Sequence, residues 1–416
     1  MRQSDSLTNA GACIEMISSP FGAIEQAPPD PIIGLTEAFN ADRNPRKVNL
    51  GVGVYQDSTG KVPLLDVVRK AEDVWREKEN TKSYLPIDGL AAYNKAVQNL
   101  LFGQDAAVIA EGRVITVQAL GGTGALKVGA DFLRRFFPGA EVWISDPSWE
   151  NHRMLFEAAG FKVNSYPYYD AETRGLNFGA MLQSLEQLPA NSIVVLHARC
   201  HNPTGVDLTR DQWKILVDLF HSSGLIPFID FAYQGFGGGL DDDAFAVKAF
   251  ADAGIPCLIA SSFSKSFALY RERVGALTIV TGGGEESKRI LSQVKRIIRT
   301  NYSSPASHGA QIVAAVLGDA QLRKDLEVEL DGMRERIQEM RDLFVATLRE
   351  KGVEQDFSFI TQQRGMFSYS GLNRAAVDRL RDEFGIYIVG SGRICLAALN
   401  RDNVGYVCEA IADVLA

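Results

Sequence analysis

The feature that most constrains the fold is a regular alternation of apolar and amphipathic segments between residues 113 and 280. Short apolar segments predict strands at 114–119, 141–145, 162–168, 192–198, 225–231, 256–262 and 275–280. Helical patterns such as 153–159 and 210–222 lie between them. Strands joined by helices predict an α/β fold with a mostly parallel, seven-stranded sheet covered on both faces. Such sheets bind ligands at the carboxyl ends of their strands, so polar residues there are the first candidates for a functional site.

The composition argues against several classes of protein. The 416 residues are 46% hydrophobic and 23% charged, as in ordinary globular proteins, with a formal net charge of −8. The negative charge argues against a nucleic-acid-binding surface, and no apolar run has the length of a membrane span. Five cysteines are scattered without a C-x-x-C pair, which favours reduced thiols in a cytoplasmic protein over disulfides or a zinc site.

The segments on either side of the sheet predict further organisation. A length of 416 residues suggests two or three domains. Apolar residues at spacings of three and four predict a long amphipathic helix that ends near residue 350 and leads to a smaller α+β domain. Near the N-terminus, 48–55 is strand-like, and the prolines of 28–31 predict an extended arm. Residues 1–20 do not have the pattern of a signal peptide; they are either an extension or partly precede a true start at Met16.

Gly121, Gly122, Thr123 and Gly124 form a predicted turn between the first strand and a helix. Bare N–H groups at a helix N-terminus suit a phosphate, and Thr123 adds a hydroxyl. A tight turn without any ligand would have the same sequence. The run matches neither G-x-G-x-x-G nor the Walker pattern, which disfavours nicotinamide and nucleoside-triphosphate cofactors.

Aromatic and amide side chains follow two other strands. Trp149 offers a flat face to a ring, although an aromatic residue after a turn more often serves packing. His152, close by, is interpreted as a loop histidine with a structural role. Pro203 and Gly205 make a rigid turn that would hold the amide of Asn202 in one place.

A carboxylate and a lysine complete the set. Asp230 ends an apolar run, where an unpaired carboxylate is energetically costly. It could be compensated by an ion-pair partner, a helix N-terminus or a protonated ring nitrogen of a ligand. In the last case Tyr233 is near enough to bond another substituent of that ring. Lys265 lies between two strands among small hydroxyls, and its segment fits a solvated lysine and an amine nucleophile equally well. The cofactor pyridoxal 5′-phosphate (PLP) requires all of these features together: a phosphate-binding site, a flat aromatic side chain, an acid to pair with its ring nitrogen, and a lysine amine.

These residues resemble those of the class I PLP-dependent aminotransferases, in particular the bacterial aspartate and aromatic-amino-acid aminotransferases. The resemblance extends from about Phe21 to the C-terminus and is carried by segments 121–126 (GGTGAL), 201–205 (HNPTG), 230–236 (DFAYQGF), 262–265 (SFSK) and 301–305 (NYSSP). It implies the type I fold of PLP-dependent transferases. It also implies an N-terminal extension and dimer arm (1–29), a small domain built from 30–62 and 331–416, and a large PLP-binding domain (63–330).

The resemblance implies a role for each candidate. Lys265 would hold PLP as a Schiff base and later move a proton between the substrate Cα and the cofactor C4′. Asp230 would keep the pyridine nitrogen protonated. Tyr233 and Asn202 would bond the ring 3-oxygen, and Trp149 would stack on the ring. The remaining cofactor-binding residues would be Gly121, Gly122, Thr123, Ser262, Ser264, Arg273 and, from a neighbouring subunit, Tyr84.

Substrate-binding residues follow from the same resemblance. Arg393 would bind the substrate α-carboxylate as a bidentate pair, and Arg299 of the partner subunit would bind a second, side-chain carboxylate. Because Tyr84 and Arg299 would act across an interface, a homodimer with shared sites is implied. No metal is expected. The pocket wall would further include Gly53, Trp149, Asn202 and Phe367.

The preferred amino acid is less constrained. Val62, Ser304 and Pro86 match the aromatic branch of the family, whereas Val54 and Thr123 are aspartate-like. We expect a broad-specificity enzyme that moves the amino group of tyrosine, phenylalanine and/or aspartate to 2-oxoglutarate. The alternatives are a strict aspartate aminotransferase, a β-lyase or decarboxylase of the same fold, and a non-catalytic PLP-binding regulator, which the lack of a basic helix-turn-helix segment disfavours.

Overall fold

A seven-stranded sheet forms the centre of the computed structural model, which describes residues 19–27, 33–78 and 81–416. Its strand order is β2 (Val114–Leu120), β10 (Val274–Val280), β9 (Cys257–Ser262), β8 (Ile226–Phe231), β7 (Ile193–His197), β3 (Val142–Asp146) and β4 (Val163–Pro167). Each strand matches a predicted one to within about two residues, so the α/β expectation is confirmed. Within this sheet β10 runs antiparallel to both of its neighbours, and the other pairings are parallel.

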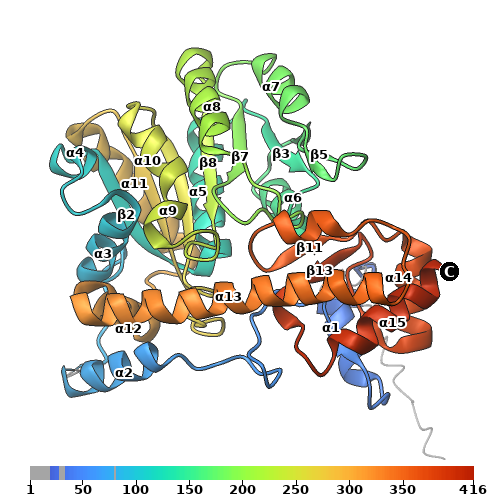
Figure 1. Cartoon of the computed structure of the whole chain (residues 1–416). Coiled ribbons are helices and arrows are strands. Elements are labelled where there is room, and N and C mark those ends of the chain that lie inside the picture. Colours follow the sequence, from blue (N-terminus) through green and yellow to red (C-terminus); the bar gives the residue numbers. More distant parts are fainter. Residues whose placement is uncertain (1–18, 28–32, 79–80) are drawn as a thin grey trace, which may run out of the picture.

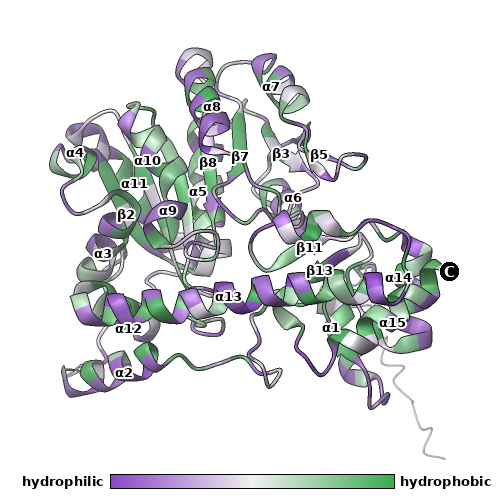
Figure 2. Ribbon diagram, in the orientation of Figure 1, coloured by the Kyte–Doolittle hydropathy of each residue, from purple (hydrophilic) through white to green (hydrophobic). Residues whose placement is uncertain are grey.

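Helices cover both faces of the sheet, because its strands send alternate apolar side chains in opposite directions. On β8, Phe228 joins the hydrophobic core formed with α5 (Gly121–Phe136), α6 (Glu150–Ala158) and α11 (Gly284–Asn301). Its neighbour Ile229 joins the core formed with α3 (Ala91–Phe102), α8 (Arg210–Ser223) and α10 (Phe245–Asp252). Figure 2 shows hydrophobic strands inside and helices with a hydrophilic outer face. Two cores therefore fix the sheet from both sides.

A long helix leads from the sheet to the rest of the chain. α13 (Ala320–Glu350) follows α12 (His308–Gly318) and runs across the molecule to α15 (Val404–Leu415), as Figure 1 shows. This confirms the predicted amphipathic helix. In the smaller part, β1 (Val48–Asn49) pairs with β12 (Ile386–Tyr387), and β11 (Phe367–Tyr369) pairs with β13 (Arg393–Cys395). The remaining elements are α1 (Ile33–Ala41), α2 (Asp66–Lys78), α4 (Ala107–Ala110), β5 (Tyr169–Asp170), β6 (Gly175–Leu176), α7 (Phe178–Glu186), α9 (Leu240–Asp243), α14 (Arg374–Phe384) and two short 3₁₀ helices, Ser358–Gln362 and Leu396–Ala398.

Two sequence expectations are wrong in detail. Segment 48–55 forms a strand only at β1. Leu50 still bonds to backbone groups, but beyond it the N–H of Gly51 donates to Asn49 Oδ1 and that of Tyr55 to the Tyr270 hydroxyl. The glycine run is not a turn before the helix but its first turn. Gly121 adopts φ of +69°, which lets β2 pass directly into α5.

The N-terminal expectations fall mostly on residues that lie outside the described part of the chain. These are residues 1–18 of the extension, with the possible start at Met16, and the proline-rich segment 28–31. Within the described ranges, none of the helices has both the length and the apolar character needed to cross a lipid bilayer.

Candidate active site

A cavity of about 380 Å³ opens at the carboxyl edge of the sheet. Its volume lies in the range of small-molecule sites. Most of the residues singled out from the sequence line it: Gly53, Gly122, Thr123, Trp149, Asn202, Asp230, Tyr233, Ser262, Ser264, Lys265, Arg273, Phe367 and Arg393. Gly121, Tyr84 and Arg299 do not line it.

Strand direction explains why residues so far apart in sequence meet here. Asp230 and Ser262 lie at the carboxyl ends of the parallel strands β8 and β9, and Lys265 and Asn202 follow β9 and β7. Arg273 precedes β10, but β10 is antiparallel, so its beginning lies at the same edge of the sheet. A single reversed strand therefore brings an arginine to the place where its neighbours bring an acid, an amide and a lysine.

Lys265 presents an amine without a partner. Its Nζ lies 5.1 Å from the centroid of the Tyr233 ring and makes no hydrogen bond or ion pair with the described residues. Burial lowers the pKa of Lys265 to about 8; Asp230 opposes this shift, whereas Arg273 and Arg393 add to it. A lysine with this pKa has a substantial neutral fraction near neutral pH, which is the reactive form of an amine.

Asp230 is held ionised by a buried histidine. Asp230 is 6% exposed, and its Oδ2 lies 2.9 Å from Nε2 of His152. The other ring nitrogen of His152, Nδ1, lies 2.9 Å from Ser148 Oγ. Burial acts to raise the pKa of Asp230, but the hydrogen bond from His152 and nearby positive charge outweigh it, so the pKa is lowered. An anionic Asp230 at the pocket wall suits a protonated ring nitrogen.

Two histidines contribute in a way that the sequence interpretation missed. His152 is not in a loop: it lies in the first turns of α6 and contacts Asp230. His197 lines the cavity, and burial lowers its pKa to about 3, so it is neutral. His152, His197 and Asp230 bring ligand atoms within 4.8 Å of one another, as a metal site would. However, the 2.9 Å contact between His152 and Asp230 is a hydrogen bond that already joins two of those atoms.

The other end of the cavity suits a phosphate. Gly122 and Thr123 open α5, so backbone N–H groups and the positive end of the helix face this part of the pocket. A Cβ at Gly122 would lie 3.1 Å from Ser262 Cβ, so the glycine allows close approach of the two segments. Arg273 supplies a guanidinium, and Gly121, outside the cavity wall, makes room for it: a Cβ there would lie 2.5 Å from Arg273 Nη2. With the free amine of Lys265, these residues fit PLP.

Arg393 is a buried guanidinium that meets no carboxylate among the described residues. It is 1% exposed, donates to Asn202 Oδ1 at 3.1 Å and to the Gly51 carbonyl at 2.7 Å, and its Nε is buried without a partner. Its Cζ lies 4.4 Å from the centroid of the Phe367 ring. Gly53 lets that ring approach, because a Cβ there would lie 2.8 Å from Phe367 Cζ. An unpaired buried arginine is costly, so this site suits a carboxylate that arrives with the substrate.

Tyr84 and Arg299 lie outside this cavity within the single chain. The Tyr84 side chain is 93% exposed, and Arg299, near the end of α11, is exposed and donates to the Ser303 hydroxyl. Leu126 and Met154 line the cavity instead and make part of its wall apolar. Leu126 belongs to segment 121–126 but had no role assigned, and no sequence motif pointed to Met154, because the directions in which both side chains face depend on the packing of α5 and α6.

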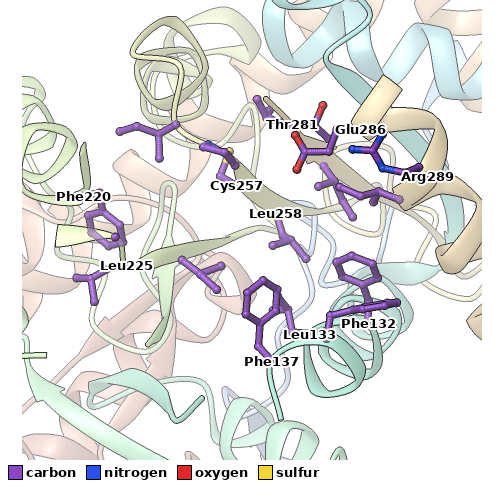
Figure 3. Close-up of a pocket in the computed structure, with 18 of the residues that line it drawn as sticks. Phe132, Leu133, Phe137, Phe220, Leu225, Cys257, Leu258, Thr281, Glu286 and Arg289 are labelled. Carbon is purple, nitrogen blue, oxygen red and sulfur yellow. The ribbon is translucent and has the colours of Figure 1, made fainter. Parts of the chain in front are cut away.

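A larger cavity, of about 730 Å³, lies at the opposite edge of the sheet (Figure 3). Its walls are mainly apolar and include Phe132, Phe220 and Leu258, with Arg289 among the charged residues at its border. Burial raises the pKa of the Cys257 thiol in this cavity to about 12, so the thiol is unreactive at neutral pH. The smaller cavity, where acid, amine and guanidinium converge, is therefore the candidate active site.

Known proteins are similar to this chain in sequence and in fold. The family model "Aminotransferase class I and II" matches residues 45–411. An aspartate aminotransferase of Pseudomonas aeruginosa is 58% identical over 397 residues, covering 95% of this chain and all of the relative. The aromatic-amino-acid aminotransferase of Escherichia coli is 50% identical over 387 residues, covering 93% of this chain and 98% of the relative.

The structural comparison agrees with these relatives. The crystal structure of an aromatic-amino-acid aminotransferase from Burkholderia pseudomallei, covalently bound to pyridoxal phosphate, superposes with a TM-score of 0.93 and 59% sequence identity. The match covers 96% of this chain and all of that one. Since both the family model and the relatives span nearly the whole sequence, the chain belongs to the class I and II aminotransferases.

Proposed function

We propose that this aminotransferase moves the amino group of aromatic amino acids and of aspartate to 2-oxoglutarate, with PLP bound covalently at Lys265. The observation that carries the proposal is the convergence of an unpartnered amine at Lys265, an anionic Asp230 and a carboxylate-free Arg393 on one cavity. When bound, PLP withdraws electrons from the substrate Cα, so that the Cα proton can be removed.

The protein residues supply binding and proton transfer. Arg393 holds the substrate α-carboxylate and thereby orients the Cα–H bond toward Lys265. Once the substrate amino group has displaced it from PLP, Lys265 Nζ, with its lowered pKa, would accept this proton and deliver it to the cofactor carbon. Asp230, kept anionic by His152, would retain a proton on the ring nitrogen. Tyr233 and Asn202 would donate hydrogen bonds to the ring oxygen, and Trp149 would cover one ring face.

The phosphate end needs only binding residues. Backbone N–H groups of Gly122 and Thr123, the hydroxyls of Ser262 and Ser264, and the Arg273 guanidinium would hold the dianion, with Tyr84 of the partner subunit added from outside. Gly121 would act indirectly, through the room it leaves for Arg273. These groups fix the cofactor without taking part in proton transfer.

Acceptance of both substrate types is supported by the walls of the site. Trp149, Phe367, Leu126 and Met154 provide apolar surface for an aromatic side chain. Arg299 would bind the distal carboxylate of aspartate, glutamate or 2-oxoglutarate. The relatives include both aspartate and aromatic-amino-acid aminotransferases at comparable identity, which favours neither substrate alone.

We further propose a homodimer in which each subunit completes the other's site with Tyr84 and Arg299. Several apolar side chains in the N-terminal part of the chain are exposed, which supports a covered surface there: Phe21 at 71%, Ile24 at 72%, Val62 at 45% and Leu64 at 49%. Mixing Lys265→Ala and Arg299→Ala chains tests this. A hybrid dimer would regain one of its two sites, and about half of the dimers in an equal, random mixture are hybrids, so aspartate activity should return to about a quarter of the wild-type value. Absence of recovery in a verified hybrid would contradict sharing of the sites.

The domain division at 1–29, 30–62, 63–330 and 331–416 remains our proposal. Pairing of β1 with β12 supports joining 30–62 to the C-terminal part, since it ties Val48 to Ile386. The boundary at residue 330 would fall inside α13, so this helix would belong to both domains. We also propose a cytoplasmic location, which four free, buried cysteines support: Cys200, Cys257, Cys395 and Cys408.

Steady-state kinetics with tyrosine, phenylalanine and aspartate as donors and 2-oxoglutarate as acceptor tests the proposed specificity. We expect turnover of all three. Negligible turnover of the aromatic pair, with normal turnover of aspartate, would leave a strict aspartate aminotransferase. Formation of pyruvate, ammonia or CO₂ from the donor would instead indicate a lyase or decarboxylase, and binding of PLP without any turnover would indicate a regulator.

A further inference from the structure

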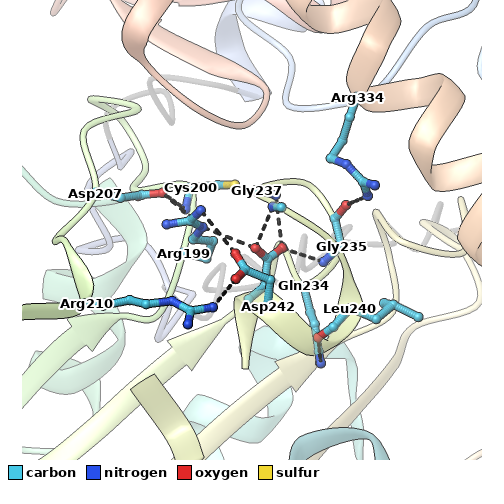
Figure 4. A network of polar contacts seen from close by, with 12 residues as sticks. Arg199, Cys200, Asp207, Arg210, Gln234, Gly235, Gly237, Leu240, Asp242 and Arg334 are labelled. Atoms are coloured by element: carbon cyan, nitrogen blue, oxygen red, sulfur yellow. Dashed lines mark hydrogen bonds and ion pairs between the residues drawn. The ribbon is translucent and has the colours of Figure 1, made fainter. Parts of the chain in front are cut away.

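Two loops of the active site are joined by a group of charged side chains outside the cavity (Figure 4). Arg199 Nε donates to Asp243 Oδ1 at 3.1 Å and lies 3.6 Å from Asp207 Oδ2. The Asp243 side chain is fully buried and that of Asp207 is 10% exposed. Arg210 and Asp242 extend the group toward solvent, where their side chains are 64% and 41% exposed. The two inner carboxylates are therefore largely shielded from water, whereas the Arg199 side chain is 25% exposed.

Asp207 fixes the backbone immediately before Asn202. Its Oδ2 accepts the N–H of Cys200 at 3.0 Å, and its Oδ1 accepts the N–H of His201 at 2.9 Å. Cys200 has a φ of +54°, which is unfavourable for a residue with a side chain and needs support from its surroundings. The carboxylate provides that support, so the direction in which Asn202 leaves the turn depends on Asp207.

Asp243 does the same for the loop that follows Tyr233. Its two oxygens accept the N–H groups of Gly235 at 2.8 Å, Gly237 at 2.9 Å and Gly238 at 2.8 Å. Gly237 must lack a side chain, because a Cβ there would lie 2.2 Å from Arg199 Nε. The glycine-rich loop is thus wrapped around the carboxylate, and Tyr233 lies at its beginning.

Among the described residues, Arg199 is the one cation that forms ion pairs with both carboxylates. Burial raises the pKa values of Asp207 and Asp243, and in both cases Arg199 acts in the opposite direction. A second guanidinium, that of Arg210, pairs with Asp242 and lies over the Phe245 ring, but it forms no ion pair with Asp207 or Asp243. Removal of Arg199 would leave two buried carboxylates without a countercharge, which is strongly unfavourable. The two loops would then lose the common element that sets their separation.

We infer that Arg199, Asp207 and Asp243 form a clamp that positions Asn202 and Tyr233 relative to each other. The inference rests on the proposed function, in which these two side chains bond the same oxygen of PLP. The clamp residues touch neither substrate nor cofactor, so they are positioning residues. They would act on the geometry of the two hydrogen bonds that Asn202 and Tyr233 make to the ring oxygen. These hydrogen bonds would set the proton affinity of the cofactor while it is bound to Lys265.

The test uses the PLP-loaded enzyme carrying Arg199→Met, which keeps side-chain length but removes the charge. The readout is the pH midpoint of the visible absorption change of the bound cofactor, together with the PLP dissociation constant and kcat/KM. Because weaker hydrogen bonds to the ring oxygen leave it more basic, we expect the midpoint to move upward by about one unit. We expect kcat/KM to fall about 10- to 100-fold, as when supporting residues of a site are lost.

Arg210→Met is the matched control, because it removes a guanidinium from the same group that bonds no active-site loop. It should leave the absorption midpoint and kcat/KM within about twofold of wild type. Asn202→Ala and Tyr233→Phe measure the directly bonded residues. If they shift the midpoint but Arg199→Met does not, the clamp is wrong and the proposed function stands. If none of the three shifts it, the proposed roles of Asn202 and Tyr233 themselves fail.

Loss of folding is handled by two milder variants. Should Arg199→Met fail to fold, Arg199→Lys keeps a charge and Asp207→Asn keeps the side-chain shape. Both should move the absorption midpoint upward by less than Asn202→Ala does, with a urea unfolding midpoint close to wild type. A wild-type absorption midpoint in both variants would overturn the clamp.

Discussion

The two edges of the central sheet each border a cavity, and they differ in what the strands deliver there. At the carboxyl edge, strand ends bring Asp230, Ser262 and Lys265 to a pocket of about 380 Å³. At the opposite edge, the starts of β8 and β9 bring mainly apolar side chains to a cavity of about 730 Å³. The larger cavity is therefore the poorer candidate for chemistry: convergence of charged groups, not volume, distinguishes the active site.

The largest effect should come from Lys265→Ala at the carboxyl edge. This removes the amine that we propose binds PLP and moves the Cα proton, so turnover should fall by at least about 10⁴-fold. Rates of 2-oxo acid formation measure it, and circular dichroism checks the fold. Lys288→Ala, at a lysine that is 75% exposed, is the control and should keep wild-type turnover. Multiple turnovers by Lys265→Ala would contradict the assignment.

Asp230→Asn should have the next largest effect. The amide cannot stabilise a positive charge on the ring nitrogen, so kcat should fall about 10²- to 10³-fold. The matched variant His152→Gln removes the partner that holds Asp230, and its smaller loss should have the same sign. Equal kcat values for Asp230→Asn and wild type would show that the buried carboxylate serves the fold alone.

Arg299→Ala separates the two classes of substrate. The half-reaction with aspartate should slow about 10²-fold through loss of a charge-assisted hydrogen-bonded pair, and the half-reaction with phenylalanine should change little. Single-turnover absorption changes measure each donor without 2-oxoglutarate, which itself carries two carboxylates. Arg393→Ala is the comparison variant and should slow both donors. Equal losses for both donors in Arg299→Ala would refute the division between the two arginines.

The pKa of Lys265 predicts how the enzyme without cofactor captures PLP. Only the neutral amine reacts, so the capture rate should rise about tenfold per pH unit at low pH and level off above the lysine pKa of about 8. An ordinary lysine, with a pKa of about 10.4, would give a rate that keeps rising well beyond this point. Stopped-flow absorption from about pH 6 to 9.5 distinguishes the two.

The smallest effect on activity should come from the opposite edge. Leu258 is 4% exposed and lines the larger cavity. Leu258→Ala should lower the free energy of unfolding by about 2–4 kcal/mol, because it removes buried methyl groups. It should leave kcat/KM within about twofold of wild type. A large kinetic loss without loss of stability would show that the apolar edge participates in catalysis.

The outline of the fold and most of the site could be predicted because they depend on local patterns. The strands of the sheet are continuous apolar runs; Asp230 lies near the end of one, and Lys265 and Asn202 come shortly after two others. The role of His152 could not be predicted, because it acts through Asp230, which is 78 positions away in the sequence. The link from Arg199 to Asp243 spans 44 positions and has no motif. The helical start at Gly121 depends on its contact with Arg273, which only the assembled sheet provides.

Two half-reactions test whether Lys265 and the residues around it support amino transfer from both aromatic and acidic donors. The PLP-loaded enzyme is mixed separately with tyrosine and with aspartate, without any 2-oxo acid, and its visible absorption is followed. We expect each donor, added in excess, to convert the bound cofactor to its amine form, and 2-oxoglutarate then to restore the original spectrum. Conversion by neither donor, or by aspartate alone, would contradict this expectation.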